Sequence, residues 1–232
     1  MVTGRGWTQA GGRPHAEAVA LDQAGERAAG ATAYVTLEPC AHESERGPAC
    51  ADRLIAAGVA RVAVGILDPD SRTAGQGLAR LRAAGIVAEC TDHAASRRSL
   101  AGYLARARSG RPHVTLKLAL SLDGQLALAD GSSRWITGPE ARAHVHSRRA
   151  LADAILVGGG TWRADVPRLD VRLPGLDTRS PERCVLTSRP VEGARSIASP
   201  EAIGDMTDVQ YLYVEGGAQA AEGEGDAAGH AV

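Results

Sequence analysis

The chain has 232 residues, a formal net charge of −1 and 44% hydrophobic residues, with no Phe. This length allows two modest domains or one large one, with a core of Ala, Val, Leu and Ile. The near-zero net charge excludes a general electrostatic field for nucleic acid or anionic membranes. No apolar run reaches the ~20 residues of a membrane span, and the first residues lack the apolar segment of a secretory signal. Four cysteines without framework spacing fit a reducing compartment, so we expect a cytoplasmic protein.

In the first part of the chain, predicted helices alternate with predicted strands. Apolar residues at helical spacing, with Pro14 suited to a first turn and Gly58 suited to a helix end, mark the helices. The predicted helices span residues 14–26, 49–58 and 77–85, and the predicted strands span residues 31–38, 61–70 and 86–90. This alternation is typical of an α/β domain with a largely parallel sheet.

Residues 95–110 form an amphipathic helical pattern rich in Arg, and the sequence Ser-Gly-Arg-Pro that follows it indicates a boundary. We interpret the basic run as a solvated face of a linker helix, not as a binding patch. A second α/β pattern then begins. In residues 113–130, two apolar segments flank a hairpin-like or sharply bent turn at Asp123-Gly124.

Further elements follow this turn. A helix is predicted at 138–153, and strands at 154–160, 183–188 and 209–217. The strand at 154–160 runs into three glycines, whose bare N–H groups would let a dinucleotide phosphate approach, although such runs also form ordinary tight turns. The final stretch, AEGEGDAAGHAV, is small and polar, which predicts a disordered tail.

The most informative motif lies in the first half. His15 and Glu17 stand in RPHAEAV at the start of a predicted helix, and Cys40 and Cys50 flank a polar loop after a predicted strand. Catalytic zinc typically takes three protein ligands and keeps a fourth position for water. His15, Cys40 and Cys50 would supply the three, and Glu17 would carry a proton from the water to a substrate nitrogen.

This order is similar to the H-x-E and P-C-x-x-C signature of zinc deaminases, although the second cysteine here lies farther away. The alternative is that the two cysteines are unrelated thiols and that His15 is a surface histidine. Cys90 and Cys184 lie in apolar strands, and we expect them to be core residues.

Longer matches carry a specific resemblance. GGRPHAEAVAL, YVTLEPCAH and GPACADRLIAAGVARVAVGILDPD resemble the deaminase half of a bifunctional riboflavin-biosynthesis family. That family joins a diaminohydroxyphosphoribosylaminopyrimidine deaminase to a 5-amino-6-(5-phosphoribosylamino)uracil reductase. Its usual loop reads P-C-x-H-x-G-R-T-x-P-C, whereas this chain is one residue longer and lacks the Gly-Arg-Thr order. The resemblance implies that His42 faces the substrate.

GRPHVTLKLALSLDGQLA and the stretch from Ser133 to Arg172 resemble the reductase half of the same family. The resemblance implies an α/β protein in which a cytidine-deaminase-like zinc domain precedes a dihydrofolate-reductase-like domain. The domains implied are a zinc-dependent deaminase at 1–94, a linker helix at 95–111, an NADPH-dependent reductase at 112–218 and the tail at 219–232.

The resemblance also implies roles for single residues of the second half. The positions that match NADP contacts are Ala119, Trp135, Thr161, Asp165, Ser188 and Gly217. The positions that match contacts to the ribosyl-phosphate substrate are Lys117, Ser133, Arg149, Leu169, Arg172 and Glu215. Lys117 is the only lysine in the chain, and an arginine fork suits phosphate because it bonds two oxygens at once.

The implied chemistry is hydrolytic deamination of 2,5-diamino-6-(5-phosphoribosylamino)pyrimidin-4(3H)-one at zinc, followed by NADPH-dependent reduction of its ribosyl group to ribityl. We expect a small-molecule substrate, no nucleic acid or membrane partner, and a homo-oligomer. Compared with the family, both ends of the chain are short. A competing hypothesis is therefore a non-catalytic remnant that binds zinc or nucleotide, and a third is a deaminase of nucleic-acid bases, which the charge and the lack of an aromatic groove disfavour.

Overall fold

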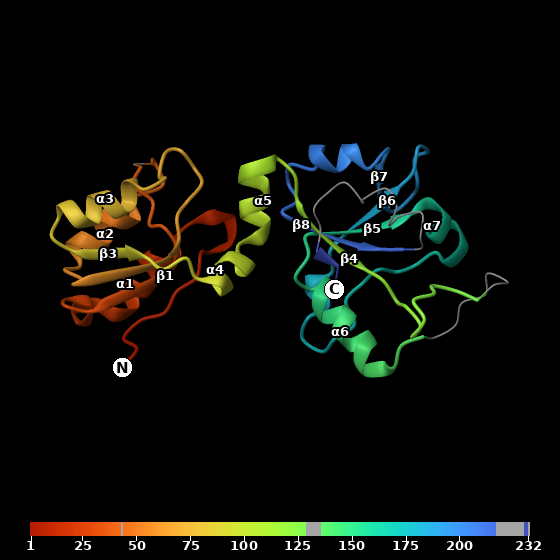
Figure 1. Cartoon of the computed structure of the whole chain (residues 1–232), viewed down its shortest axis with the longest axis horizontal. Coiled ribbons are helices and arrows are strands. Elements are labelled where there is room, and N and C mark those ends of the chain that lie inside the picture. Colours follow the sequence, from red (N-terminus) through yellow and green to blue (C-terminus); the bar gives the residue numbers. More distant parts are fainter. Residues whose placement is uncertain (43, 129–135, 217–229, 232) are drawn as a thin grey trace. The chain divides into compact units, whose positions relative to one another are not determined.

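The structure is a computed structural model that describes residues 1–42, 44–128, 136–216 and 230–231. The chain divides into two compact units, residues 1–107 and 108–232, drawn from red to yellow-green and from green to blue in Figure 1. Within the described residues, no helix is long and apolar enough to cross a membrane.

The first unit is built on a sheet of three parallel strands in the order β1-β2-β3. Its strands are β1 (Thr32–Leu37), β2 (Arg61–Ile66) and β3 (Val87–Cys90). Its helices are η1 (Ala10–Gly12), α1 (Ala16–Ala24), η2 (Gly25–Ala28), α2 (Cys50–Ala56), α3 (Gln76–Ala83), α4 (Ala94–Ser99) and most of α5 (Ala101–Ser109). The central strand β2 is buried from its second residue onward, as its apolar sequence predicts for the middle of a parallel sheet.

Alternate residues of β2 serve the two faces of this sheet. Val62 and Val64 pack with Leu54 of α2 and Leu81 of α3 in the main core. Gly65 belongs to the other face, where α4 lies against β1 and β2. A β-carbon on Gly65 would lie 2.3 Å from Ser96 Oγ, so only glycine allows α4 to approach this closely.

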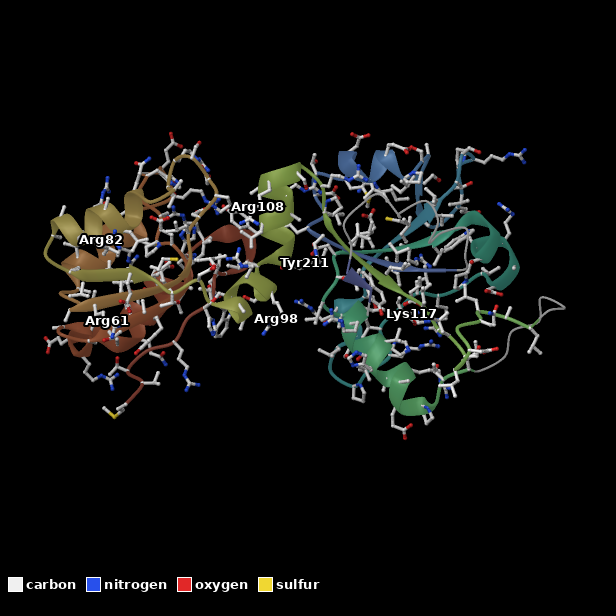
Figure 2. All side chains as sticks on the ribbon, viewed as in Figure 1. Arg61, Arg82, Arg98, Arg108, Lys117 and Tyr211 are labelled. Carbon is white, nitrogen blue, oxygen red and sulfur yellow. The ribbon has the colours of Figure 1, made fainter. Side chains whose placement is uncertain are left out.

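The single linker helix predicted for residues 95–111 is wrong, because the structure has two helices there. Leu100 leaves helical geometry with φ −107° and ψ 15°, so α4 ends at Ser99. The physical reason is packing: α4 lies on the sheet through buried Ser96, which fixes its direction independently of α5. Arg98 and Arg108 on these helices are exposed (Figure 2).

The second unit is a six-stranded parallel sheet in the order β7-β6-β5-β8-β4-β9. Its strands are β4 (His113–Lys117), β5 (Ala154–Gly158), β6 (Glu182–Leu186), β7 (Arg195–Ile197), β8 (Tyr211–Glu215) and β9 (His230–Ala231). Its helices are α6 (Pro139–Arg149), α7 (Gly159–Asp165), η3 (Asp177–Arg179) and η4 (Glu201–Asp205). Both faces of β5 are buried. Leu156 packs with Ile203 of η4 on one face, and Ile155 and Val157 pack with Val145 and Trp162 on the other.

The turn predicted at Asp123-Gly124 is present, because Gly124 N–H donates to Ser121 C=O over 2.9 Å. Residues 118–128 contain no strand, so of the two predicted alternatives the turn is a sharp bend and not part of a hairpin. Both edges of β4 are occupied in this sheet, by β8 and by β9, so a hairpin partner has no continuous edge to pair with.

Two other boundaries differ from the prediction. Gly159 and Gly160 begin helix α7 and do not extend the preceding strand. The predicted disordered tail at 219–232 is wrong for His230–Ala231, which pair with Thr115 and Leu116 of β4. A strand edge offers unpaired N–H and C=O groups to any extended segment, and side-chain composition does not reveal that pairing.

We predict that Gly77→Ala destabilises the first unit. The new methyl carbon would lie 2.1 Å from the carbonyl oxygen of Pro39, so the backbone must shift, at a cost of about 1–3 kcal/mol. In an open helix the same change would stabilise by up to ~1 kcal/mol, so the sign is diagnostic. Urea unfolding followed by far-UV circular dichroism measures it, with Ala79→Ser at an exposed position of α3 as the control. Unchanged or increased stability of Gly77→Ala would contradict the close packing.

Candidate functional site

The three predicted zinc ligands come from three different elements of the first unit. His15 is the N-cap residue of α1, Cys40 lies three residues beyond the end of β1, and Cys50 is the first residue of α2. In a parallel α/β sheet, the carboxyl ends of strands and the N-termini of the following helices meet at one edge. The fold therefore brings together residues that are up to 35 positions apart.

Their ligand atoms are close enough to share one cation. His15 Nδ1 lies 3.2 Å from Cys50 Sγ and 3.6 Å from Cys40 Sγ, and all three ligand atoms lie within 4.8 Å of one another. Bond lengths of about 2.0–2.3 Å to zinc in a tetrahedron require ligand separations of about 3.3–3.8 Å. One imidazole nitrogen and two thiol sulfurs in this arrangement therefore fit zinc with one coordination position left over.

The two thiols are electrostatically unequal. A hydrogen bond with Cys50 lowers the pKa of Cys40 to about 5, and the backbone N–H of Cys50 also donates to Cys40 Sγ over 3.3 Å. The same hydrogen bond, together with burial, raises the pKa of Cys50. Metal binding requires both thiols to lose their protons, because thiolates and not thiols are the metal ligands.

Glu17 lies in the first turn of α1, two residues after His15, and is not among the three groups that converge. Burial raises the pKa of its carboxyl group, while a hydrogen bond with Cys50 acts in the opposite direction. A carboxyl group that can be protonated beside a metal ligand set can take up and return a proton at that place.

The loop that carries Cys40 is anchored by Glu38, which the sequence reasoning did not single out. Glu38 is 2% exposed, and its carboxylate accepts hydrogen bonds from the N–H groups of Gly75 (2.9 Å), Leu78 (3.1 Å) and Asp68 (3.3 Å). These bonds join the end of β1 to the loop after β2 and to the start of α3. The available signal was an acidic residue between an apolar strand and Pro39-Cys40, a place where a buried charge needs several donors.

His42 stands two residues beyond Cys40 and is partly buried. Its Nδ1 lies 3.5 Å from Oγ1 of Thr73, which is fully buried in the loop before α3. Arg13, two residues before His15, donates from Nη1 to the carbonyl oxygen of Pro48 over 3.4 Å. The loops before His15 and before Cys50 are therefore tied to each other beside the ligand group.

In the second unit, several predicted cofactor and substrate residues follow the carboxyl ends of strands. Lys117 ends β4 and Glu215 ends β8, and the two are paired in register (Lys117 is labelled in Figure 2). Thr161 lies in α7 directly after β5, while Ala119 and Ser188 follow β4 and β6 by two residues. Ligands of open parallel sheets bind at this edge.

Arg149 and Glu215 form a buried ion pair. Arg149 Nε and Nη2 donate to the two carboxylate oxygens of Glu215 over 2.6 and 2.9 Å, and both side chains are about nine-tenths buried. Arg149 Nη1 donates to the carbonyl oxygen of Asp170 over 3.0 Å. The sequence predicted both residues but not that the fork of Arg149 is directed at a carboxylate.

The segment around Leu169 and Arg172 is shaped by this pair and by His146. Leu169 is buried with φ +53°, which is rare for a residue with a branched side chain. His146 Nδ1 lies 3.1 Å from Asp170 C=O and 3.2 Å from Arg172 N–H, so either ring tautomer bonds one of them. Burial lowers the pKa of His146, and the charges of Arg149 and Arg172 lower it further.

The remaining predicted residues are placed as follows. Asp165 is the last residue of α7 and is exposed. Ser133, Trp135 and Gly217 lie outside the described residues. Cys184 is fully buried, as predicted for a core residue, whereas Cys90 is exposed, because β3 is an edge strand of the first sheet.

Two family models match separate parts of the chain. The model of the cytidine and deoxycytidylate deaminase zinc-binding region matches residues 2–66, and the model of the RibD C-terminal domain matches residues 112–198. The first match contains the three converging ligands and Glu17. The second covers β4 to β7 together with the segment around Leu169.

Curated proteins are similar in sequence to the chain across both units. The chain is 49% identical over 180 residues to the riboflavin biosynthesis protein RibD of Escherichia coli K12, covering 77% of this chain and 49% of that protein. It is 43% identical over 207 residues to RibD of Mycobacterium tuberculosis H37Rv, covering 87% of this chain and 60% of that protein. The chain thus spans about half the length of these curated relatives.

Two solved structures align over nearly the whole chain. Acinetobacter baumannii RibD, form 1, has a TM-score of 0.76 and 36% identity, covering 94% of this chain and 71% of that one. A deaminase/reductase from Thermotoga maritima has a TM-score of 0.79 and 30% identity, covering 92% of this chain and 70% of that one. The Thermotoga maritima protein is named a diaminohydroxyphosphoribosylaminopyrimidine deaminase and 5-amino-6-(5-phosphoribosylamino)uracil reductase.

We predict that Cys50→Ala abolishes stoichiometric zinc binding by the purified chain. Cys50 Sγ is one of three converging ligand atoms, and loss of a thiolate removes an anionic bond that two remaining ligands cannot replace. Metal analysis of the dialysed protein measures zinc per chain. Cys90→Ala, which removes an exposed thiol of β3, should leave the zinc content unchanged. Equal zinc in the Cys50→Ala variant and the unsubstituted chain would contradict the site.

A second prediction concerns the ion pair in the other unit. Glu215→Gln leaves the guanidinium of Arg149 buried without its carboxylate partner, so we expect a loss of stability on the order of 3 kcal/mol. Thermal or urea unfolding measures it. Glu182→Gln removes a carboxylate of comparable chemistry that lies 3.5 Å from Arg195 at the surface, and it should cost at most ~1 kcal/mol. Equal effects of the two substitutions would show that burial adds nothing to the Arg149–Glu215 pair.

Proposed function

We infer the function from one premise: the chain belongs to the RibD family of riboflavin-biosynthesis proteins. We propose that it is a bifunctional enzyme that first deaminates 2,5-diamino-6-(5-phosphoribosylamino)pyrimidin-4(3H)-one and then reduces the ribosyl group of the product to ribityl with NADPH. The observation that carries the proposal is the convergence of His15, Cys40 and Cys50 beside Glu17 in the unit that matches a deaminase zinc-binding region.

For the first reaction, His15, Cys40 and Cys50 would hold zinc, which supplies Lewis-acid activation of water when bound. Glu17 would carry one proton from the attacking water to a ring nitrogen and then carry the second proton of that water to the amino group, which leaves as ammonia. Its raised pKa suits this task, because a group that must accept and return a proton works best with a pKa nearer to neutrality. His42 would contact the pyrimidine beside the ligand group.

For the second reaction, NADPH supplies a hydride when bound. The residues proposed to contact it are Ala119, Trp135, Thr161, Asp165, Ser188 and Gly217. Those proposed to hold the phosphoribosyl substrate are Lys117, Ser133, Arg149, Leu169, Arg172 and Glu215. The support for this assignment is their placement: Lys117 and Glu215 are register partners at the carboxyl ends of β4 and β8, and Glu215 fixes Arg149 there. The contribution of these residues would be to hold nicotinamide and sugar carbon C1′ in register.

We also propose that the protein works in the cytoplasm, because all four of its cysteines are free thiols, which suits a reducing compartment. The homo-oligomer expected from the sequence stays a prediction.

We predict that Glu17→Gln retains zinc but lowers deaminase turnover about 10²–10⁴-fold, because the amide cannot carry a proton. Ammonia release from the diaminopyrimidine substrate measures turnover, and metal analysis of the same sample measures zinc. Glu26→Gln, at an exposed acid of η2, is the matched control and should keep full activity.

The outcomes separate the competing hypotheses. If the unsubstituted chain binds zinc but neither releases ammonia nor oxidises NADPH with the deaminated product, the chain is a non-catalytic binder. Full ammonia release by Glu17→Gln would contradict the role of Glu17.

A further inference from the structure

The segment Arg168–Arg172 places one acid between two arginines. The carboxylate of Asp170 lies 2.8 Å from Arg168 Nη2 and 3.4 Å from Arg172 Nε. The two arginine side chains are 77% and 59% exposed, whereas that of Asp170 is only 21% exposed. The carboxylate of Asp170 is therefore mostly buried, and it forms ion pairs with two arginines that are mostly exposed to solvent.

The backbone of this segment is fixed independently of the Asp170 side chain. The carbonyl oxygen of Asp170 accepts a hydrogen bond from Arg149 Nη1 over 3.0 Å and lies 3.1 Å from His146 Nδ1. The next residue, Val171, donates its N–H to Ser180 Oγ over 3.0 Å. The main chain is therefore held on both sides of Asp170, which fixes the position from which its side chain reaches the two arginines.

A cavity of about 300 Å³ opens beside this acid. Its lining is Arg168, Leu169, Asp170, Ser180, Pro181 and Arg183. The guanidinium groups of Arg168 and Arg183, the carboxylate of Asp170 and one hydroxyl give the lining a formal charge of +1. Arg172 is not part of the lining and reaches the cavity only through its ion pair with Asp170. That size and charge suit a phosphate-bearing ligand of small size, and the carboxylate is the one lining group that opposes such a ligand.

We propose that Asp170 sets the affinity of this segment for a phosphate-bearing ligand by competing with the phosphate for Arg168 and Arg172. The inference rests on the proposed function, in which Leu169 and Arg172 hold the phosphoribosyl group, and it adds Arg168 as a second cation for the same phosphate. Carboxylate and phosphate groups both form hydrogen-bonded ion pairs with guanidinium groups. Binding of the phosphate must therefore break the ion pairs that Asp170 forms with the two arginines. The phosphate then lies close to a fixed negative charge, which further weakens binding.

This competition predicts a substitution that improves binding. Asp170→Asn keeps the size of the side chain and leaves the backbone bonds to Arg149 and His146 untouched, but it removes the competing charge. We expect the affinity of the full chain for ribose 5-phosphate to rise roughly threefold to tenfold, as for a unit charge a few ångströms away in a solvated site. Isothermal titration calorimetry at low and at moderate ionic strength measures the dissociation constant.

The control is Asp205→Asn, which makes the same change of net charge at an exposed position of η4. η4 packs on the opposite face of the sheet from Leu169, so this substitution should leave affinity unchanged. The double substitution Asp170→Asn with Arg172→Ala tests whether the gain in affinity depends on Arg172. If Asp170 acts through Arg172, most of the gain disappears in the Arg172→Ala background. A merely structural role for Asp170 would not produce a gain at all.

The possible outcomes distinguish a failure of this inference from a failure of the proposed function. Tighter binding by Asp170→Asn alone, lost without Arg172, supports the proposal. Unchanged or weaker binding by Asp170→Asn in a variant with the circular dichroism spectrum and melting temperature of the unsubstituted chain overturns it and leaves the proposed function intact. The same gain in Asp205→Asn also overturns it, because net charge alone would then explain the effect. If no variant binds ribose 5-phosphate at either ionic strength, the proposed phosphoribosyl site and the inference both fail.

Discussion

The buried carboxylate of Glu38 is the interaction on which the metal centre depends. Cys40 belongs to an irregular loop, and a metal site requires its sulfur to stay within a few ångströms of His15 and Cys50. The backbone N–H groups of Asp68 and Gly75, between β2 and α3, and of Leu78 in the first turn of α3 converge on Glu38. They fix the chain immediately before Cys40. A charge this deeply buried is tolerated because it is fully hydrogen-bonded, and the same bonds make the loop rigid.

In the second unit, a buried charged side chain likewise fixes the backbone that carries the polar residues. There the buried charge is Arg149, held by both oxygens of Glu215 at the end of β8 and by the main chain at Asp170. Helix α6, strand β8 and the segment around Leu169 therefore meet at one guanidinium. Both units thus use a buried charged side chain with three hydrogen bonds to immobilise irregular backbone at the carboxyl ends of parallel strands, where ligands of such sheets bind.

Much of this arrangement follows from the sequence. Periodicity placed the helices and strands of the first unit within a few residues, and the residue types in HAE and EPC indicated the ligands that the fold brings together. The predictions that failed concern features that are set by contacts between segments far apart in the sequence. The break at Leu100 depends on where α4 packs, and the strand at His230 depends on an open edge of β4. The partners of Glu38 and Arg149 come from distant segments, so no local pattern reveals them.

The most direct test of the account is X-ray absorption spectroscopy at the zinc K-edge of the purified, zinc-loaded chain. The account predicts two sulfur neighbours at about 2.3 Å, one imidazole nitrogen at about 2.0 Å and one further light atom. A shell of four sulfurs, or a shell of nitrogen and oxygen only, would contradict it, because His15, Cys40 and Cys50 would then not bind the metal together.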